Sequence, residues 1–173
     1  MTDETLKING IKIKPTLSRK ELISKALIKK KSLVAINAHK ILLADDKFRG
    51  FVNSNIGYCD GLGAKIALKR LSNKKIIRIP GCELWIDILD EYHDKKTFYI
   101  IGSTDLIINK TIKKLKIDYP TIDILKYRNG FFKDKTEYEN MINEIVRLKP
   151  EIIFIAMGSP LQENLIVELS KKH

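Results

Sequence analysis

Short apolar runs alternate with longer amphipathic segments along most of the chain. The runs are bounded by turn residues and lie at residues 33–36, 56–58, 98–101, 122–125 and 152–156. Between them are segments with apolar residues at helical spacing, such as CELWIDILDEYH, TDLIINKTIKKLK and EYENMINEIVRLK. Pro120 and Pro150 each precede a run, where a proline ends the helix before it. Strands that alternate with helices predict a mostly parallel sheet covered by helices on both faces.

The first 31 residues follow a different pattern. LKINGIKIK places Asn9-Gly10 between two short alternating runs, which predicts a β-hairpin. In the segment that follows, Ser18 and Glu21 have the spacing of a capping box. An apolar stripe then predicts an amphipathic helix that ends in three lysines: Leu22, Ile23, Ala26 and Leu27, then Lys29, Lys30 and Lys31.

Length, composition and charge narrow the possible classes of protein. A length of 173 residues favours a single domain, here a hairpin and basic helix over 1–31 and an α/β core over 32–173. With 44% apolar and 31% charged residues, the chain has the composition of a soluble globular protein. The net charge of +11 indicates an anionic partner: nucleic acid, an anionic membrane surface or a phosphorylated ligand. The alternative is that the lysines are scattered over solvated faces.

Cys59 and Cys82 are the only cysteines in the sequence, without the spacing of a zinc site, so we expect no metal centre and a reduced, cytoplasmic chain. The polar opening MTDETLKING is unlike a signal peptide. No apolar run approaches the ~20 residues of a membrane span, although the protein can still touch a membrane.

A polar or glycine-containing turn follows each predicted strand. Because ligands of open α/β sheets bind outside the carboxyl ends of the strands, where helix N-termini suit phosphate, these turns together predict a nucleotide-type pocket in a Rossmann-like fold. The turns are Asn37, Asp60-Gly61, Gly102-Ser103-Thr104, Arg128-Asn129-Gly130 and Gly158-Ser159-Pro160.

Several motifs of other enzyme classes are missing. Gly61 and Gly63 begin a G-x-G, but Ile66 stands where a dinucleotide fingerprint has its third glycine. The sequence also lacks a phosphate-binding G-x-x-x-x-G-K-[ST] loop, a G-x-S-x-G nucleophile elbow and a D-x-D pair at a strand end. Dehydrogenase, NTPase and serine hydrolase functions are therefore disfavoured, and we expect no cofactor.

In order, these segments resemble the WecG/TagA/CpsF family of bacterial glycosyltransferases. The resemblance runs from about Leu33 to the C-terminus and depends on the ordered set rather than on any single piece. The pieces are AINAHKILLA, CDGLG, RIPGCEL, FYIIGS, YPTIDILKYRNGFF and IFIAMGSPLQE.

The resemblance implies a UDP-sugar-dependent hexosyltransferase. Members transfer a sugar, typically N-acetylmannosamine, with inversion to a polyprenyl-diphosphate-linked acceptor at the cytoplasmic membrane face. Such transfer feeds teichoic acid, common antigen or capsule synthesis. The expected partners are thus the donor, the acceptor and the inner face of the plasma membrane. A homo-oligomer is compatible with the apolar helix faces.

Asp60 matches the aspartate of the family's D-G motif, which is proposed there as the catalytic base. Inverting transfer needs one carboxylate within hydrogen-bond reach of the acceptor hydroxyl. The alternative for Asp60 is an N-cap of the helix that begins near Gly61 or Leu62. One carboxylate can serve both roles.

Other matched residues are expected to bind substrate. Asn37 would contact sugar hydroxyls or the acetamido group, with an ordinary Asx-turn as its alternative. Arg78 would contact the donor diphosphate, with a surface ion pair as its alternative. Gln162, and with less support Glu163, would contact the nucleotide from the start of the last helix.

Glycines and an aromatic complete the predicted site. Gly102 and Gly130 would allow close approach of the backbone to the ligand, and Gly61 and Gly158 belong to turns of the same pocket. Phe132, with Phe131, would shelter the uridine. The alternative for both phenylalanines is a place in the core.

The sequence departs from the family at several positions. Cys59 replaces a proline, Leu161 replaces a lysine and Ala35 stands where many members have threonine. The chain ends at His173, whereas relatives continue with a strand and a basic C-terminal segment. We therefore expect weak UDP binding and slow turnover from this chain alone.

Two other functions stay open. A non-catalytic relative would bind UDP-sugar without turnover. A nucleic-acid-binding module would explain the net charge, but the lysines spread over nearly every predicted helix and no nucleic-acid motif is present, so we expect no nucleic-acid partner. The basic end of the first helix is a candidate for contact with anionic lipid, the alternative being a helix packed on the sheet with solvated lysines.

Overall fold

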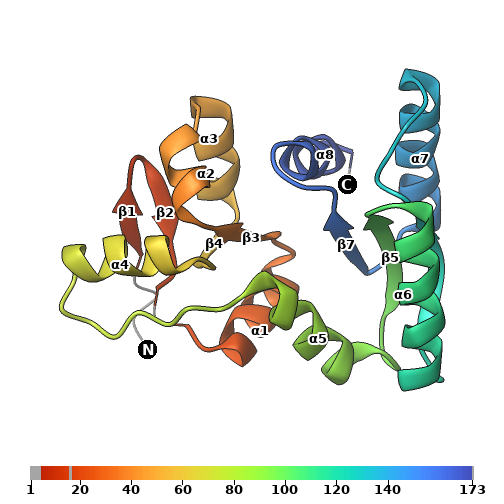
Figure 1. The fold of residues 1–173 in the computed structure, drawn as a ribbon, viewed down its shortest axis with the longest axis horizontal. Helices are drawn as coiled ribbons and strands as arrows, with labels where there is room; N and C mark the ends of the chain where they lie inside the picture. Colours follow the sequence, from red (N-terminus) through yellow and green to blue (C-terminus); the bar gives the residue numbers. More distant parts are fainter. Residues whose placement is uncertain (1–4, 16, 173) are drawn as a thin grey trace. The chain divides into compact units, whose positions relative to one another are not determined.

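The structure is a computed structural model that describes residues 5–15 and 17–172. The chain divides into two compact units, residues 1–88 and 89–173, and each is described by itself (Figure 1). Because α5 (Gly81–Tyr92) runs through residue 88, this helix contributes to both units. The single-domain organisation predicted from length stays a prediction.

Unit 1 opens with the hairpin predicted at Asn9-Gly10. These two residues have φ angles of 44° and 81°, the left-handed conformation that a two-residue hairpin turn requires. The capping box of α1 is also confirmed, since the Ser18 side chain accepts from Glu21 N–H and the Glu21 side chain accepts from Ser18 N–H. The elements of unit 1 are β1 (Leu6–Ile8), β2 (Ile11–Ile13), α1 (Arg19–Lys29), β3 (Leu33–Ile36), α2 (Ala38–Leu43), α3 (Asp46–Ser54), β4 (Ile56–Cys59), α4 (Leu62–Leu71) and the start of α5.

Strand β4 is held on both sides. It pairs in parallel with β3, from Leu33 opposite Ile56 to Ile36 opposite Cys59. On its other side, Lys14 N–H donates to the Gly57 carbonyl at 2.8 Å, and Ile79 N–H donates to the Cys59 carbonyl at 2.8 Å. All residues of β4 are buried. Hydrogen bonds on both sides therefore hold the end of this strand, and Asp60 follows it directly.

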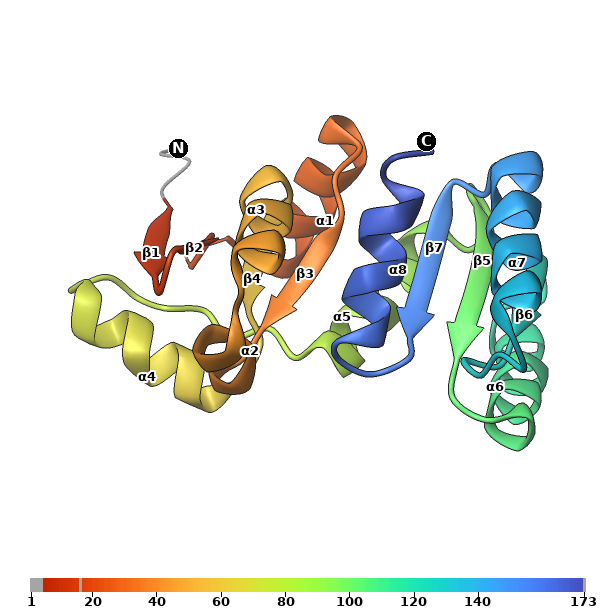
Figure 2. The same cartoon turned by 90° about the horizontal axis from the view of Figure 1, so that it is seen from above.

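Unit 2 is a parallel sheet with helices packed on it. Its strand order is β6-β5-β7, and β5 and β7 lie side by side (Figure 2). The elements of unit 2 after α5 are β5 (Thr97–Gly102), α6 (Asp105–Asp118), β6 (Asp123–Arg128), α7 (Lys135–Leu148), β7 (Ile152–Ala156) and α8 (Leu161–Leu169).

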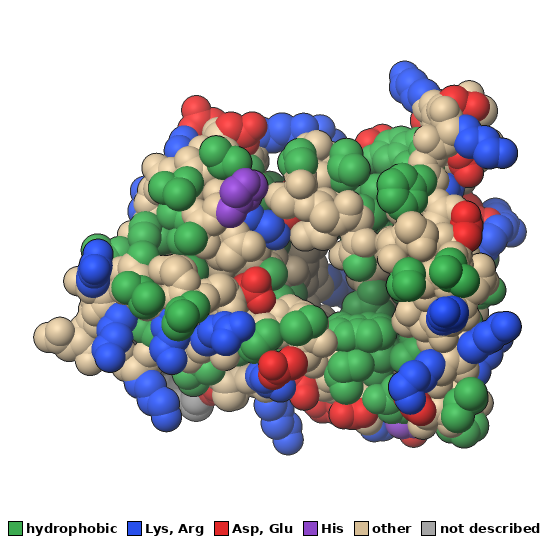
Figure 3. Space-filling model, in the orientation of Figure 1, with side chains coloured by type: hydrophobic (Ala, Val, Ile, Leu, Met, Phe, Trp, Pro, Cys, Tyr) green, Lys and Arg blue, Asp and Glu red, His purple; other side chains and the backbone are tan. Residues whose placement is uncertain are grey.

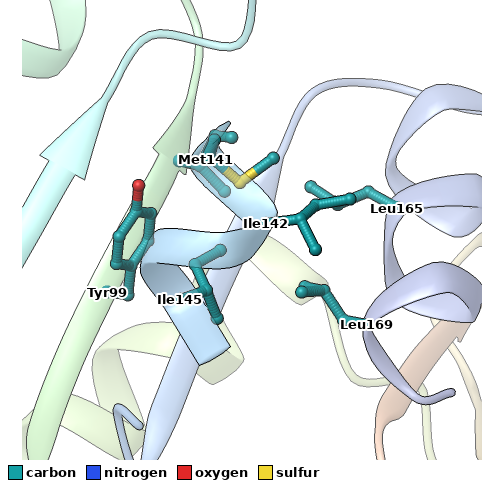
Figure 4. Close-up of a cluster of buried hydrophobic side chains, with 7 residues drawn as sticks. Tyr99, Met141, Ile142, Ile145, Leu165 and Leu169 are labelled. Atoms are coloured by element: carbon teal, nitrogen blue, oxygen red, sulfur yellow. The ribbon is translucent and has the colours of Figure 1, made fainter. Parts of the chain in front are cut away.

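The core of unit 2 joins one face of β5 to α7 and α8. Tyr99 and Ile101 lie two residues apart on β5 and so point to the same face. Their partners are fully or nearly fully buried and stand at helical spacing (Figure 4): Met141, Ile142 and Ile145 on α7, and Leu165 and Leu169 on α8. Each such side chain stabilises the fold by roughly 1.5–3 kcal/mol through burial. This packing fixes the strand ends of unit 2.

The predicted α/β, Rossmann-like class, with parallel strands and an N-terminal hairpin, is confirmed. Each predicted run forms a strand, and β3 and β7 have the predicted bounds. The largest shift is at β6, which begins one residue later than predicted and extends to Arg128. No helix in the described part of the chain is long and apolar enough to span a membrane.

Candidate functional site

Asp60 lies at the carboxyl end of β4 and is tied to the start of α5. Its Oδ1 accepts a hydrogen bond from Gly81 N–H at 2.8 Å. Its own N–H donates to the Ile36 carbonyl at 3.0 Å, which continues the β3–β4 pairing by one residue. Within the described residues, Asp60 Oδ2 forms no hydrogen bond. The half-buried carboxylate is thus oriented through one oxygen and keeps the other to accept a proton.

The alternative in which Asp60 caps α4 is wrong. The N-cap of α4 is Gly61, and no side chain makes a capping hydrogen bond there. Asp60 instead accepts the first N–H of α5, the helix that begins 21 residues later. The positive end of that helix stabilises the ionised carboxylate.

Arg78 lies beside Asp60 in the segment that leads into α5. Its Nε donates to the Asp60 carbonyl oxygen at 2.9 Å, and its side chain is exposed. It forms no ion pair with a carboxylate side chain in the part of the chain that the structure describes. The hydrogen bond from Nε therefore holds one edge of the guanidinium, and the exposed side chain is accessible to an anionic ligand.

Glycines bring the helix N-termini of unit 1 close together. A Cβ on Gly61 would lie 3.0 Å from Asn37 Cβ, and a Cβ on Gly63 would lie 2.9 Å from Ala38 Cβ. A Cβ on Gly81 would lie 3.1 Å from the Tyr58 hydroxyl. The starts of α4 and α5 thus approach Asp60 closely, and helix N-termini are favourable sites for anions.

Asn37 is the N-cap of α2. Its Oδ1 accepts from Lys40 N–H at 3.0 Å, which is the Asx-type arrangement given above as its alternative. The side-chain amide of Asn37 has two further N–H groups, so contact with a sugar stays a prediction. The buried Lys40 places its Nζ 3.0 Å from the Ala35 carbonyl, at the end of β3. Sequence reasoning missed this ammonium, and its only signal was a lysine in the first turn after a strand.

Burial changes the acidity of the two residues before Asp60. Burial raises the pKa of Tyr58 well above its usual value, and the Asp60 charge raises it further. Burial also raises the pKa of Cys59 to about 11, again with a contribution from Asp60. Both groups are therefore neutral at physiological pH, and neither adds a negative charge at this strand end.

In unit 2, Gly102 and Gly130 lie where the strand ends meet. Gly102 has a φ of 149°, and a Cβ there would lie 2.2 Å from the Ala156 carbonyl oxygen. Gly130 N–H donates to the Ser103 carbonyl at 2.9 Å, and a Cβ on Gly130 would lie 3.2 Å from Gly102 Cα. Both glycines are thus required by contacts of the protein with itself. Their contact with a ligand stays a prediction.

The start of α8 contains the next predicted residues. Gly158 has a φ of 79° and open space around its missing Cβ, so its backbone conformation alone favours glycine. Gln162 donates through Nε2 to Glu163 Oε1 at 3.0 Å, and Glu163 is buried in the first turn of α8. Gln162 is half-buried, and its contact with a nucleotide stays a prediction.

Phe132 is half-buried and packs against the core of unit 2. Its ring meets Tyr138 edge-on at 5.0 Å between centroids, and the guanidinium of Arg128 lies 4.0 Å above it. Phe131 is exposed. The structure therefore gives Phe132 a packing role, and its role toward uridine stays a prediction.

A cleft of about 430 Å³ lies along the edge strand β6. Arg128 and Asn129 of one predicted pocket turn line it, but none of the residues matched individually to catalysis or substrate binding does. Its lining comes from α6, β6, α7 and the turn after β6: Asp105, Ile108, Asn109, Lys126, Tyr127, Arg128, Asn129, Glu137, Asn140, Met141 and Glu144. Many of its polar groups bond one another, including Asn129 Nδ2 to Asp105 Oδ1 at 2.7 Å and Tyr127 Oη to Asn109 Oδ1 at 3.2 Å. Over the described residues, no group of three or more His, Cys, Asp or Glu side chains is arranged to hold a metal ion.

Comparison with known proteins decides the family. The sequence matches the Glycosyl transferase WecG/TagA/CpsF family over residues 6–173. The chain belongs to this family. The predicted resemblance is therefore confirmed, and it extends through the N-terminal hairpin as well as the core.

Two curated Bacillus proteins are similar to this WecG/TagA/CpsF chain. Both are named N-acetylglucosaminyldiphosphoundecaprenol N-acetyl-beta-D-mannosaminyltransferase. The protein of Bacillus spizizenii is 32% identical over 108 residues, which are 62% of this chain and 41% of the relative. The protein of Bacillus subtilis is 30% identical over 123 residues, which are 70% of this chain and 46% of the relative. The matched part thus spans less than half the length of either relative.

Proposed function

We propose that this chain is the catalytic core of a transferase that moves N-acetylmannosamine from a UDP-sugar to a polyprenyl-diphosphate-linked N-acetylglucosamine acceptor. Membership of a glycosyltransferase family and the names of two relatives support the reaction class and the acceptor. The UDP-sugar donor, a role in cell-surface polysaccharide or teichoic acid synthesis, and a place at the inner face of the plasma membrane are parts of the same proposal.

The observation that carries the proposal is the geometry of Asp60. Gly81 N–H holds one carboxylate oxygen at 2.8 Å, and the second oxygen has no hydrogen bond among the described residues. A general base needs a fixed position and an oxygen that can reach the proton it removes. In the proposed reaction, Asp60 Oδ2 takes the proton of the acceptor hydroxyl while the hydroxyl oxygen attacks the anomeric carbon. The bond from that carbon to the UDP oxygen breaks, and UDP leaves with the electron pair.

The leaving group is anionic, so positive groups near Asp60 favour its departure. Arg78 donates to the Asp60 carbonyl oxygen and its side chain is exposed, and we assign it to the donor diphosphate. The N-termini of α4 and α5 lie at the same place and add unpaired N–H groups and positive dipole ends. Asn37 is assigned to the sugar, and Gln162 and Glu163 are assigned to the nucleotide.

The test is Asp60→Asn in an assay that measures UDP released from UDP-N-acetylmannosamine and a short-chain polyprenyl-diphosphate-N-acetylglucosamine acceptor. Asparagine can still accept the Gly81 hydrogen bond through its side-chain oxygen, so the fold should survive while the base is lost. We expect turnover to fall by roughly 10²–10⁴-fold, the usual contribution of a general base. Calorimetry should find UDP binding unchanged.

Asp45→Asn is the matched control. Asp45 also caps a helix in unit 1, since its Oδ1 accepts from Phe48 N–H at 2.7 Å, and the substitution removes the same charge. Its turnover should equal that of the parent chain. Equal turnover in Asp60→Asn would overturn the base assignment, and UDP binding by the parent chain with zero turnover would favour the non-catalytic alternative.

A further inference from the structure

Helices α2 and α4 present large apolar side chains to solvent. On α4, Leu62 and Ile66 are one turn apart and are 62% and 48% exposed. On α2, the adjacent Leu42 and Leu43 are 78% and 70% exposed. With the exposed Leu71 at the end of α4, we call these five residues the α2–α4 surface. Isolated exposed leucines are ordinary, but a group on two neighbouring helices marks an interaction site.

The two helices are in direct contact, so their apolar side chains belong to one part of unit 1. A Cβ on Gly63 of α4 would lie 2.9 Å from Ala38 Cβ of α2, and a Cβ on Gly61 would lie 3.0 Å from Asn37 Cβ. These glycines allow the helix N-termini to touch. The surface begins two residues after Asp60, because Leu62 is the first residue of α4.

Basic residues predominate around this surface, and the acids nearest to it are Asp60 and, at the start of α3, Asp45 and Asp46. Residues 61–80 contain basic residues and no acidic residue: Lys65, Lys69, Arg70, Lys74, Lys75 and Arg78. Helix α2 also lacks an acidic residue. The two acids at the start of α3 each interact within that helix, since Asp45 caps it and Asp46 pairs with Arg49 at 2.9 Å. Figure 3 shows hydrophobic and Lys/Arg side chains interleaved over the part of unit 1 where α4 runs.

We propose that the α2–α4 surface docks on an anionic lipid bilayer. A helix with exposed leucine and isoleucine on one side and lysine and arginine beside them has the pattern of an interfacial membrane helix. The apolar side chains would enter the region between headgroups and acyl chains, and the basic side chains would bind lipid phosphates. This inference rests on the proposed function in one respect: it places Asp60 next to the bilayer, where a polyprenyl-linked acceptor would present its sugar.

Helix α6 of unit 2 is the rival surface. It exposes Leu106 and Ile107, at 64% and 48%, and it also contains several lysines. Acidic residues stand near both of its ends, however, and Asp118 pairs with Lys114 at 2.8 Å. Its charge is therefore mixed where the charge of residues 61–80 is uniform. Because the exposed fractions of Leu106 and Ile107 match those of Leu62 and Ile66, α6 supplies a matched control.

The experiment is flotation of the chain with vesicles of equal parts phosphatidylglycerol and phosphatidylcholine, without donor or acceptor. We expect the parent chain to bind these vesicles and not vesicles of pure phosphatidylcholine. Leu62→Ser/Ile66→Ser should weaken binding by about tenfold or more, because apolar area no longer enters the bilayer. Lys69→Glu/Arg70→Glu should weaken binding by roughly fivefold or more for each residue.

The controls Leu106→Ser/Ile107→Ser and Lys110→Glu/Lys113→Glu on α6 should bind vesicles as the parent chain does. All these positions are exposed, so folding is expected to survive, and far-ultraviolet circular dichroism checks it. Equal loss of binding in the α6 variants, or no loss in the α4 variants, would overturn the assignment. So would self-association of the chain in sedimentation velocity that disappears in Leu62→Ser/Ile66→Ser, because a second copy would then cover the surface.

The outcome is distinguishable from that of the proposed function. Vesicle binding is measured without any substrate, so it can succeed in a chain that transfers no sugar. Conversely, a chain that transfers sugar to a short-chain acceptor in solution, yet does not bind anionic vesicles, would overturn the lipid contact alone. Asp60→Asn should bind vesicles as the parent chain does.

Discussion

The carboxylate of Asp60 accepts the backbone N–H of Gly81 at 2.8 Å, which ties the end of β4 to the first residue of α5. The bond fixes the carboxylate without consuming both of its oxygens. The Tyr58 hydroxyl explains why a glycine stands at position 81, because it lies close to the place where a Cβ would be.

The first prediction concerns this contact. In Gly81→Ala, the new Cβ would lie 3.1 Å from the Tyr58 hydroxyl, which is closer than ordinary packing allows. We expect the free energy of unfolding to fall by about 1–2 kcal/mol, within the range for overpacking. Tyr58→Phe removes the hydroxyl and should restore most of the loss in the double variant. Urea denaturation of the two single variants and the double variant measures the coupling.

Additive effects of the two substitutions on the free energy of unfolding would contradict this prediction. If Gly81→Ala costs the same with and without the Tyr58 hydroxyl, the hydroxyl is not what requires glycine at this position. A loss of sugar transfer in Gly81→Ala that is larger than its loss of stability would add that the Asp60 carboxylate has moved.

The second prediction orders three glycine-to-alanine substitutions. Gly102→Ala should lower the free energy of unfolding by about 3 kcal/mol or more, because a φ of 149° is strained for alanine and its Cβ would lie 2.2 Å from a backbone oxygen. Gly158→Ala should cost about 1–3 kcal/mol, because only its φ of 79° is unfavourable. Gly50→Ala, within α3 and in open space, should stabilise by about 0.4–1 kcal/mol.

Urea midpoints for the three variants give this order directly. Gly102 and Gly158 belong to unit 2 and Gly50 belongs to unit 1. Unfolding should therefore be followed by both fluorescence and circular dichroism, so that the unfolding of either unit is detected. A Gly102→Ala chain as stable as Gly158→Ala would mean that the β5 and β7 ends are able to separate without cost.

Local features of this fold were predictable from the sequence, and contacts between distant segments were not. The hairpin at Asn9-Gly10 and the capping box of Ser18 and Glu21 depend on residues within one turn, and both are found. The bounds of β3 and β7 follow from apolar runs with clear ends. The partner of Asp60 lies 21 residues away, at the start of α5, and no local pattern encodes that pairing.

The site shows the same division. The strand-end positions of Asn37 and Asp60 were predicted from apolar runs and the turns after them, and Arg78 was matched through a motif, since a motif records sequence order. The buried ammonium of Lys40 was missed because its burial depends on how α2 packs. Gly102 was expected to face a ligand, but the atom that requires it is the Ala156 oxygen, on a strand more than fifty residues later in the chain.

The third prediction concerns pH. Glu151 accepts hydrogen bonds from Lys96 Nζ at 2.6 Å and from Thr97 N–H at 3.1 Å, and these interactions hold its pKa below the usual 4.5. A carboxyl with a lowered pKa in the folded state stabilises the fold at pH values above its unfolded pKa. That contribution is lost as the pH falls through the folded pKa.

Glu151→Gln should therefore lower the free energy of unfolding at neutral pH by about 0.2–1 kcal/mol, the range for exposed ion pairs. The difference from the parent chain should disappear in strong acid. Urea titrations at neutral and acid pH measure both values. Glu139→Gln, whose partner Lys135 lies 3.4 Å away on the exposed side of α7, is the control. A difference that persists unchanged in acid would mean that the contribution of Glu151 is not ionic.

The tether of Asp60 also has an evolutionary consequence. Since the donor is a main-chain N–H, every residue type except proline supplies it, and no change of side-chain chemistry can abolish the donor. Mutation at position 81 is restrained by size alone, through the Tyr58 hydroxyl. The neighbouring Cys82 is exposed, and its substitution would leave the hydrogen bond to the Asp60 carboxylate in place. Under the proposed function, residues around Asp60 can therefore change, and with them the sugar accepted, while the proposed proton acceptor stays in place.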